Sequence, residues 1–284
     1  MATLSSNEIY VDEVLHRLGK RLPVLPTASL NLLNLLADKN VEYSRLLQAL
    51  EQFPSIVMRL IALANSVWSA PISPLNSLDM ACNRLGLKLV RSVSIALAVA
   101  EPFDPSRCAS FDAKKFWVNS LMRAEAAGLL AKSEGCLDIH TIRTAALLSN
   151  LGLLWLADNM PQETSRAINL ANADKDICLN QALKQHYQLG YDEVGEALLR
   201  YWRLPVVLQH AVANQFARRH TEQLCIDYVV ASAARLVSSL DHKRSHGSEA
   251  GIEIAGLDQQ DIEQISFQLR DNHAAIQELA QTLF

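Results

Sequence analysis

Apolar residues recur about every 3.6 residues along most of this chain, between glycines and prolines that lie roughly one helix length apart. In Ser29–Leu36, for example, Leu32, Leu33 and Leu36 fall on one helical face. No segment alternates apolar and polar positions with β-branched residues for long enough to predict a strand. No fixed-period repeat is visible either. The pattern therefore predicts an all-α protein.

The apolar spacing and the breaks between segments predict the helices one by one. Those before residue 105 are Ser29–Leu36, Arg45–Gln52, Ile56–Val67, Leu78–Leu85 and Leu87–Ala100. Those after it are Ala113–Ser133, Thr141–Asn150, Gln162–Asn172, Cys178–Tyr187, Asp192–Tyr201, Pro205–Phe216 and Glu222–Leu240. A charged loop is expected over His242–Gly256, followed by two helices, Asp258–Leu269 and Asn272–Leu283.

Three serines stand where a side-chain oxygen can accept a hydrogen bond from the first turn of a helix. They are Ser44, Ser55 and Ser77, each just before or within the start of a predicted helix. Gly86 is expected to end the helix that begins after Ser77, because glycine is common at helix C-termini.

Pro102 and Pro105 interrupt the helical pattern, so Glu101–Ser110 is interpreted as a linker. We therefore expect two helical lobes, residues 22–105 and 106–240. Residues 1–21 are expected to form an N-terminal helical extension, and residues 241–284 a loop and C-terminal helices. Those last helices could pack on the core, exchange between subunits or bind a partner.

Composition narrows the class of protein. Hydrophobic residues make up 50% of the 284 residues and charged residues 20%, which suits a large folded core and is too apolar for disorder. No apolar run approaches the roughly 20 residues that span a bilayer, and Met1–Tyr10 lacks the apolar core of a signal peptide. We therefore expect a cytoplasmic protein that does not bind membranes.

A net charge of −4 disfavours nucleic acid as the partner. The densest basic clusters, Arg218–His220 and His242–Arg244, are short and are interpreted as solvated segments. Four basic residues of the first lobe could line a groove for phosphates, although a solvated or salt-bridged face is the simpler interpretation. They are Arg59, Arg84, Lys88 and Arg91.

The five cysteines are widely spaced, odd in number and never arranged as CxxC, so we expect buried, reduced thiols. They are Cys82, Cys108, Cys136, Cys178 and Cys225. The four tryptophans lie on apolar faces and are expected to pack in the core. They are Trp68, Trp117, Trp155 and Trp202.

The common motifs of nucleotide binding and hydrolysis are absent from the sequence. His242 and His246 are four residues apart, but they lie in the predicted polar loop and lack a third metal ligand. A dispersed catalytic triad leaves no sequence signature, and nothing here indicates one.

An ordered series of short segments is more specific. It includes Leu22–Pro26, Phe53–Val57, Arg59–Ser66, Ala81–Gly86, Phe116–Trp117, Ala146–Leu148, Val194–Gly195 and Trp202–Pro205. Over about residues 22–240 this series closely resembles the HDOD family, a branch of the HD metallophosphohydrolase superfamily. The resemblance implies an N-terminal helical lobe packed on an HD-like helical core, and a bacterial signalling or regulatory role.

The resemblance also locates the positions of an HD metal site. Such a site holds one or two cations through a His on the long helix, a consecutive His-Asp pair and an Asp on a later helix. Here these positions carry Asn119, Ser149, Asn150 and Ala234. Two auxiliary histidine regions fall at Tyr191 and at Asn214 and Gln215. Amide and hydroxyl oxygens bind transition metals weakly, and alanine not at all.

We therefore expect no metal, no cofactor and no catalytic residue. Asn119, Ser149 and Asn150 are interpreted as a buried hydrogen-bonded cluster, with a small polar ligand pocket as the alternative. The expected function is a non-catalytic signal-transduction module that binds a signalling protein or a small ligand. The alternatives are a divergent phosphohydrolase with a weakly bound divalent cation, and a sensor of nucleotide second messengers.

Overall fold

The chain folds into helices joined by short turns, and the computed structural model describes residues 13, 22–38, 40–66, 69, 71, 73–174, 177–216, 225–246 and 257–283. Within this part of the chain no strand occurs, which confirms the all-α prediction. Apolar side chains from both predicted lobes and from the C-terminal helix belong to one continuous cluster of buried residues. The predicted extension over residues 1–21 lies almost wholly outside the described residues, and the predicted lobe boundaries stay a prediction.

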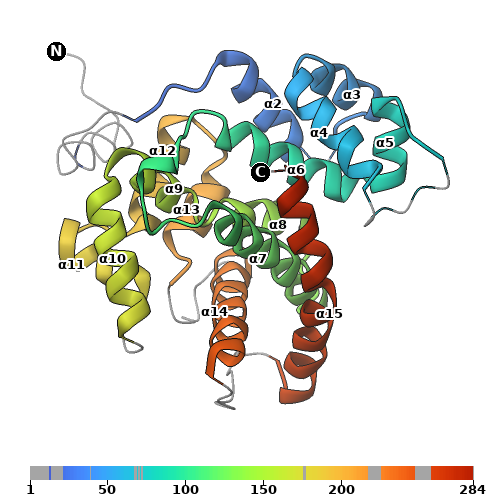
Figure 1. Ribbon diagram of the computed structural model, residues 1–284. Coiled ribbons are helices and arrows are strands. Elements are labelled where there is room, and N and C mark those ends of the chain that lie inside the picture. Colours follow the sequence, from blue (N-terminus) through green and yellow to red (C-terminus); the bar gives the residue numbers. More distant parts are fainter. Residues whose placement is uncertain are drawn as a thin grey trace.

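The N-terminal part of the chain forms a layer of short helices at the top of Figure 1. These helices are α2 (Thr27–Ala37), α3 (Tyr43–Glu51), α4 (Pro54–Ala64), α5 (Leu78–Leu85) and α6 (Leu87–Ala100). Helix α6 packs against both α2 and α8, so it joins this layer to the rest of the molecule.

A short 3-10 helix, η1 (Pro105–Arg107), leads into the second set of helices. They are α7 (Ala113–Ser133), α8 (Ile139–Leu148), α9 (Leu151–Asn159), α10 (Pro161–Ala173), α11 (Leu179–Tyr187), α12 (Tyr191–Tyr201), α13 (Val206–Ala213), α14 (Cys225–His246) and α15 (Gln259–Leu283). Helix α7 lies at the centre and packs most extensively against α8, α14 and α15 (Figure 1).

Glycine at position 128 of α7 leaves room for the guanidinium group of Arg143 of α8, which a Cβ there would meet. Arg143 in turn pairs with Glu125 of α7, with an Nη1–Oε2 distance of 2.6 Å. Lys88 of α6 reaches the same carboxylate oxygen at 3.4 Å. Glu125 therefore links three helices, one of them from the N-terminal layer.

The predicted helix positions are largely confirmed, and the cap residues partly so. Ser77 accepts a hydrogen bond from the backbone N–H of Met80, and Gly86 ends α5 with a positive φ of 77°. The other two serine caps are wrong. Helix α3 begins one residue before Ser44, and α4 begins at Pro54, which suits a first turn that needs no N–H donor.

Three features of the later helices differ from the prediction. Helix α9 was missed, because it is apolar on nearly all sides and so shows no amphipathic period. Helix α14 continues to His246, into the predicted loop. The last two predicted helices are one continuous helix, α15, which packs along α7 and also contacts α4.

Most of the basic residues of the first lobe make structural contacts. Arg91 donates to the backbone oxygens of Leu36 and Asp38 at the end of α2, and Arg84 bonds Ser69. Lys88 is paired with Glu125, whereas Arg59 lies exposed on α4. These contacts favour the salt-bridged face over a groove for phosphates.

The cysteine prediction is only partly correct. Cys82 and Cys108 are buried free thiols, but Cys178 is exposed. Cys136 is disulfide-bonded, so the expectation that every cysteine is reduced is wrong. The tryptophan prediction holds for Trp117, Trp155 and Trp202, all buried; Trp68 lies outside the described residues.

Along the stretches of chain given above, no single helix is both long and apolar enough to cross a bilayer. Helices α3 and α4 taken together pass by length and composition, but they are bent by 114° relative to each other.

Candidate functional site

Two asparagines meet at the point where α7 passes the turn between α8 and α9. The Nδ2 atom of Asn150 donates to Oδ1 of Asn119 at 3.0 Å and lies 3.4 Å from Oγ of Ser120. Asn150 and Ser120 are buried, and Asn119 is half-buried. Asn119, at the position of the first metal-binding His, and Asn150, at the position of the Asp of the His-Asp pair, are thus hydrogen-bonded to each other.

A second group of predicted residues gathers around a side chain that the sequence had not indicated, Arg123 of α7. Its Nη1 donates to Oγ of Ser149 at 3.1 Å and to Oε1 of Gln215 at 3.0 Å. Its Nη2 lies 3.4 Å from the hydroxyl of Tyr191. The guanidinium therefore holds together residues from four separate segments of the chain.

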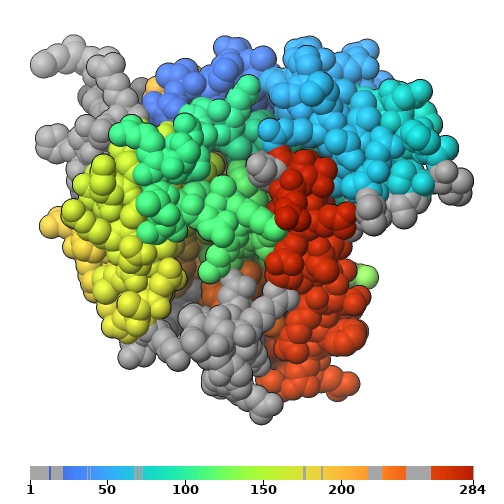
Figure 2. Space-filling model, viewed as in Figure 1, coloured from blue at the N-terminus to red at the C-terminus, as the bar shows by residue number. Residues whose placement is uncertain are grey.

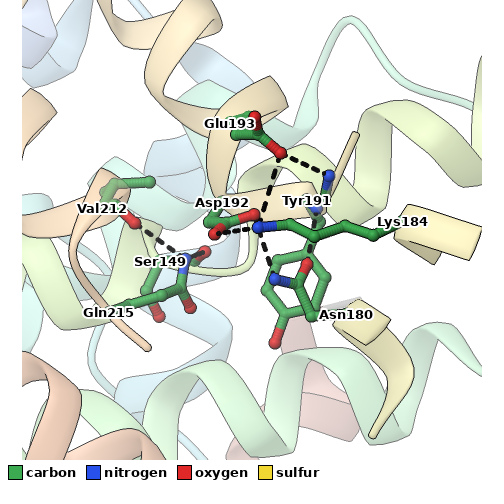
Figure 3. Close-up of polar contacts among 9 residues, drawn as sticks. Ser149, Asn180, Lys184, Tyr191, Asp192, Glu193, Val212 and Gln215 are labelled. Atoms are coloured by element: carbon green, nitrogen blue, oxygen red, sulfur yellow. Dashed lines mark hydrogen bonds and ion pairs between the residues drawn. The ribbon is translucent and has the colours of Figure 1, made fainter. Parts of the chain in front are cut away.

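The Gln215 side chain also bonds the backbone carbonyl of Ser149, as Figure 3 shows. The Nε2 atom of Gln215 donates to the carbonyl of Ser149 at 2.7 Å and to that of Val212 at 3.0 Å. Both side chains have no exposed surface. The Gln215 amide is thus fixed in one orientation, with its oxygen directed at Arg123.

Arg123 is a buried cation without an ionic partner. Its exposed fraction is 5%, and no carboxylate in the described part of the chain forms an ion pair with it. Its Nε–H is also buried and finds no hydrogen-bond partner among the described residues. Burying an unpaired charge is costly, so such a group is expected to have a specific role.

Tyr191 begins α12 beside this cluster. Burial raises the pKa of its hydroxyl, and the Arg123 guanidinium offsets this effect only in part, so the phenol stays neutral. The backbone N–H of Tyr191 donates to Asn180, whose amide bonds the buried Asp192 (Figure 3). Lys184 pairs with Asp192 at 3.3 Å. This network fixes the start of α12 and thereby the position of the Tyr191 ring.

Close packing of α9 on α12 also positions the cluster. Gly152 lies two residues after Asn150, and a Cβ at Gly152 would meet the backbone of Tyr191 and Gly195. Only glycine allows this approach. The turn that carries Ser149 and Asn150 is therefore held directly against the start of α12.

Two predicted site residues are not part of the cluster. Asn214 donates instead to Oδ2 of Asp227 on α14, at 3.2 Å. Ala234 is buried on α14 and has no side-chain donor or acceptor. The cluster thus contains Asn119, Ser149, Asn150, Tyr191 and Gln215, together with the additional residue Arg123.

This set of side chains does not fit a catalytic metal ion. Nowhere in the described ranges do three or more His, Cys, Asp or Glu side chains lie close enough to hold one. The donors that are present are neutral amides and hydroxyls, and a fixed guanidinium lies among them. Metal-activated water requires charged or imidazole ligands, so we assign no metal-dependent step to these residues.

Comparison with known proteins identifies the domain that carries this cluster. The family model for the HDOD domain matches residues 22–217, which is more than half of the chain. The chain belongs to the HDOD family. This membership confirms the resemblance seen in the sequence, and the match includes every residue of the cluster around Arg123.

Solved structures give the same fold. An HDOD domain protein of unknown function from Geobacter sulfurreducens has a TM-score of 0.72 and 20% identity, with 97% of each chain covered. A candidate signal transduction protein from Marinobacter aquaeolei VT8 has a TM-score of 0.80 and 20% identity, covering 100% of this chain and 67% of that one. A candidate phosphohydrolase from Shewanella amazonensis SB2B has a TM-score of 0.72 and 23% identity, with 98% of each chain covered. A comparison with curated proteins gives no match.

Proposed function

We propose that this HDOD protein is a non-catalytic regulatory module, which acts by binding a signalling protein or a small ligand. The observation that carries the proposal is the position of Arg123. Its guanidinium is bonded to Ser149 and Gln215, at two of the positions where the resemblance places metal ligands or auxiliary histidines. A protein side chain thus supplies the positive charge at this place in the fold.

The electrostatics of the cluster disfavour a metal ion. A divalent cation about 4 Å from a guanidinium would be repelled by about 8 kcal/mol at an effective dielectric constant near 20. The two carboxylates that would offset such repulsion at an HD site are replaced here by Asn150 and Ala234, and the two histidines by Asn119 and Ser149. The cluster therefore stabilises the junction of α7, α8, α12 and the end of α13 without offering a Lewis acid.

The similar structures include both kinds of protein, one called a candidate signal transduction protein and one a candidate phosphohydrolase. They share a fold, and fold alone does not determine activity. The side chains of this chain support the regulatory alternative, because they lack the charged ligands that metal-dependent hydrolysis requires.

Turnover of a generic phosphodiester such as bis(p-nitrophenyl) phosphate, with added Mn²⁺ and Fe²⁺, tests the proposal. We expect no release of nitrophenolate above that of a buffer blank. Activity that Asn150→Ala abolishes would contradict the proposal, provided that Asn159→Ala leaves it intact. Asn159 is a matched control, since it lies on α9 away from the cluster and bonds only Trp155 and Asp158.

A further inference from the structure

A pocket of about 300 Å³ lies between the first turns of α7, Val237 of α14 and the middle of α15. Lys114 and Lys115 line it from α7, and His273 and Gln277 line it from α15. Its volume is at the lower end of the range of about 300–1,000 Å³ that is typical of small-molecule sites. Figures 1 and 2 show α15, in red, lying against the green segment that contains α7.

The charge of this pocket favours an anion. Lys114 and Lys115 are exposed, and neither forms an ion pair with any side chain in the described ranges. Asp112 also lines the pocket, and its carboxylate caps α7 by accepting a hydrogen bond from the backbone N–H of Lys115 at 2.9 Å, so the two lysines leave an excess of one positive charge. Two ammonium groups can therefore reach a ligand at the rim, where lysine commonly binds phosphate as a point charge.

The rest of the pocket has a different chemistry. Val118, Met122 and Val237 form a small apolar floor, each with at most 9% of its surface exposed, and Asn119 and Gln277 contribute side-chain amides. An apolar surface with a few polar groups suits a flat organic ring. We propose that this pocket binds a small phosphorylated molecule of mononucleotide size, with its phosphate at the two lysines and its base over the apolar surface.

Helix α15 is essential to this site and lies beyond the segment that matches the HDOD family, residues 22–217. It contacts both α7 and α4, so it bridges the core and the N-terminal layer. A ligand that touches α7 and α15 at once would hold α15 in this place.

The pocket also reaches the cluster described above. Asn119 lines the pocket and accepts a hydrogen bond from Asn150, the neighbour of Ser149. A ligand that contacts Asn119 would therefore lie next to the turn whose other residue, Ser149, accepts a hydrogen bond from Arg123. This inference rests on the proposed function in one respect: the protein binds the ligand and does not hydrolyse it.

Isothermal titration of the full chain with GMP, AMP, ribose 5-phosphate and inorganic phosphate tests the proposal. We expect a mononucleotide to bind most tightly, because only it has both a phosphate and a base. The double variant Lys114→Gln/Lys115→Gln should weaken binding about tenfold or more, since it removes both ammonium groups that face the phosphate. The double variant His273→Gln/Gln277→Ala should also weaken it, if α15 completes the site.

Lys132→Gln is the matched control, because Lys132 is an exposed lysine in the last turn of α7, away from the pocket. An equal loss of affinity in this variant would show non-specific attraction and would overturn the proposal. So would the absence of binding by every probe, unchanged affinity in the α15 variant, or inorganic phosphate binding as tightly as GMP. Hydrolysis of bound GMP would instead contradict the proposed function and leave the pocket assignment standing.

Discussion

Replacing Glu125 by Gln removes the negative charge that links α6, α7 and α8, and its cost can be worked out from the geometry. Arg143 lies 2.6 Å from the Glu125 carboxylate, and its side chain is only 9% exposed. Without Glu125 this guanidinium would be a nearly buried, unpaired cation. Breaking a buried pair in this way costs about 3–5 kcal/mol. Because the Glu125 side chain is 24% exposed, we expect a loss at the lower end, about 3 kcal/mol.

The matched control is Lys88→Gln, which removes the other partner of the same carboxylate. The Lys88 side chain is 50% exposed and lies farther away, at 3.4 Å. Pairs of this kind contribute about 0–1 kcal/mol. Urea denaturation followed by circular dichroism measures the free energy of unfolding of each variant. The reasoning is refuted if Glu125→Gln stays within about 0.5 kcal/mol of the unaltered protein, or if Lys88→Gln costs as much.

The same ion pair predicts a dependence on pH. Burial alone would raise the pKa of Glu125, but the hydrogen bond and charge of Arg143, aided by Lys88, hold it below its ordinary value of 4.5. A carboxylate with a lowered pKa in the folded state stabilises the protein above the unfolded pKa, and this stability is lost as the pH falls through the folded pKa. The free energy of unfolding should therefore fall below about pH 4.5, and less steeply in Glu125→Gln.

Three further predictions concern substitution or labelling. Burial raises the pKa of Asp227, so stability is lost as the pH rises from its unfolded value of 3.8 to the higher folded value. Asp227→Asn should therefore raise the melting temperature at pH 7 and flatten its dependence on pH, and a lower melting temperature would refute this. Gly152→Ala should destabilise the protein by about 3 kcal/mol or more, measured by urea denaturation, because the new Cβ meets the backbone of Tyr191. A change within about 0.5 kcal/mol would contradict the close packing of α9 on α12. Labelling with a maleimide should modify Cys178 in the native state but Cys82 only after unfolding, and mass spectrometry of digested protein would reveal any other order.

Helices with clear boundaries and one apolar face could be predicted from the sequence. Leu87–Ala100 and Ala113–Ser133 are found with the predicted bounds, because a glycine or an N-cap aspartate begins each of them. Helix α9 could not be predicted in this way, since burial on nearly all sides removes the amphipathic period. Helix α15 is continuous through Asp271 and Asn272, because packing along α7 outweighs the weak helix preference of these residues.

The candidate site was predictable only in part, because its contacts join residues that are far apart in the sequence. Asn119, Ser149 and Asn150 were found from family positions, and the structure brings them to one place. Arg123 was missed, because its partners lie 26, 68 and 92 residues away in the sequence. The available signal was that Arg123 lies between Leu121, Met122 and Ala124 on a long helix, among residues expected to face the core. Asn214, in contrast, was predicted as a site residue but donates a hydrogen bond to Asp227, outside the cluster.

We propose that the Arg123 guanidinium occupies the place in this fold where an HD-type metal ion would bind. The metal content of the purified chain, measured after incubation with Mn²⁺, Fe²⁺ or Zn²⁺ and removal of unbound ions, is the most direct test. Inductively coupled plasma mass spectrometry should find less than about 0.1 equivalent of any of them per chain. About one equivalent that survives this treatment, and that Asn150→Ala or Asn119→Ala removes, would contradict the claim.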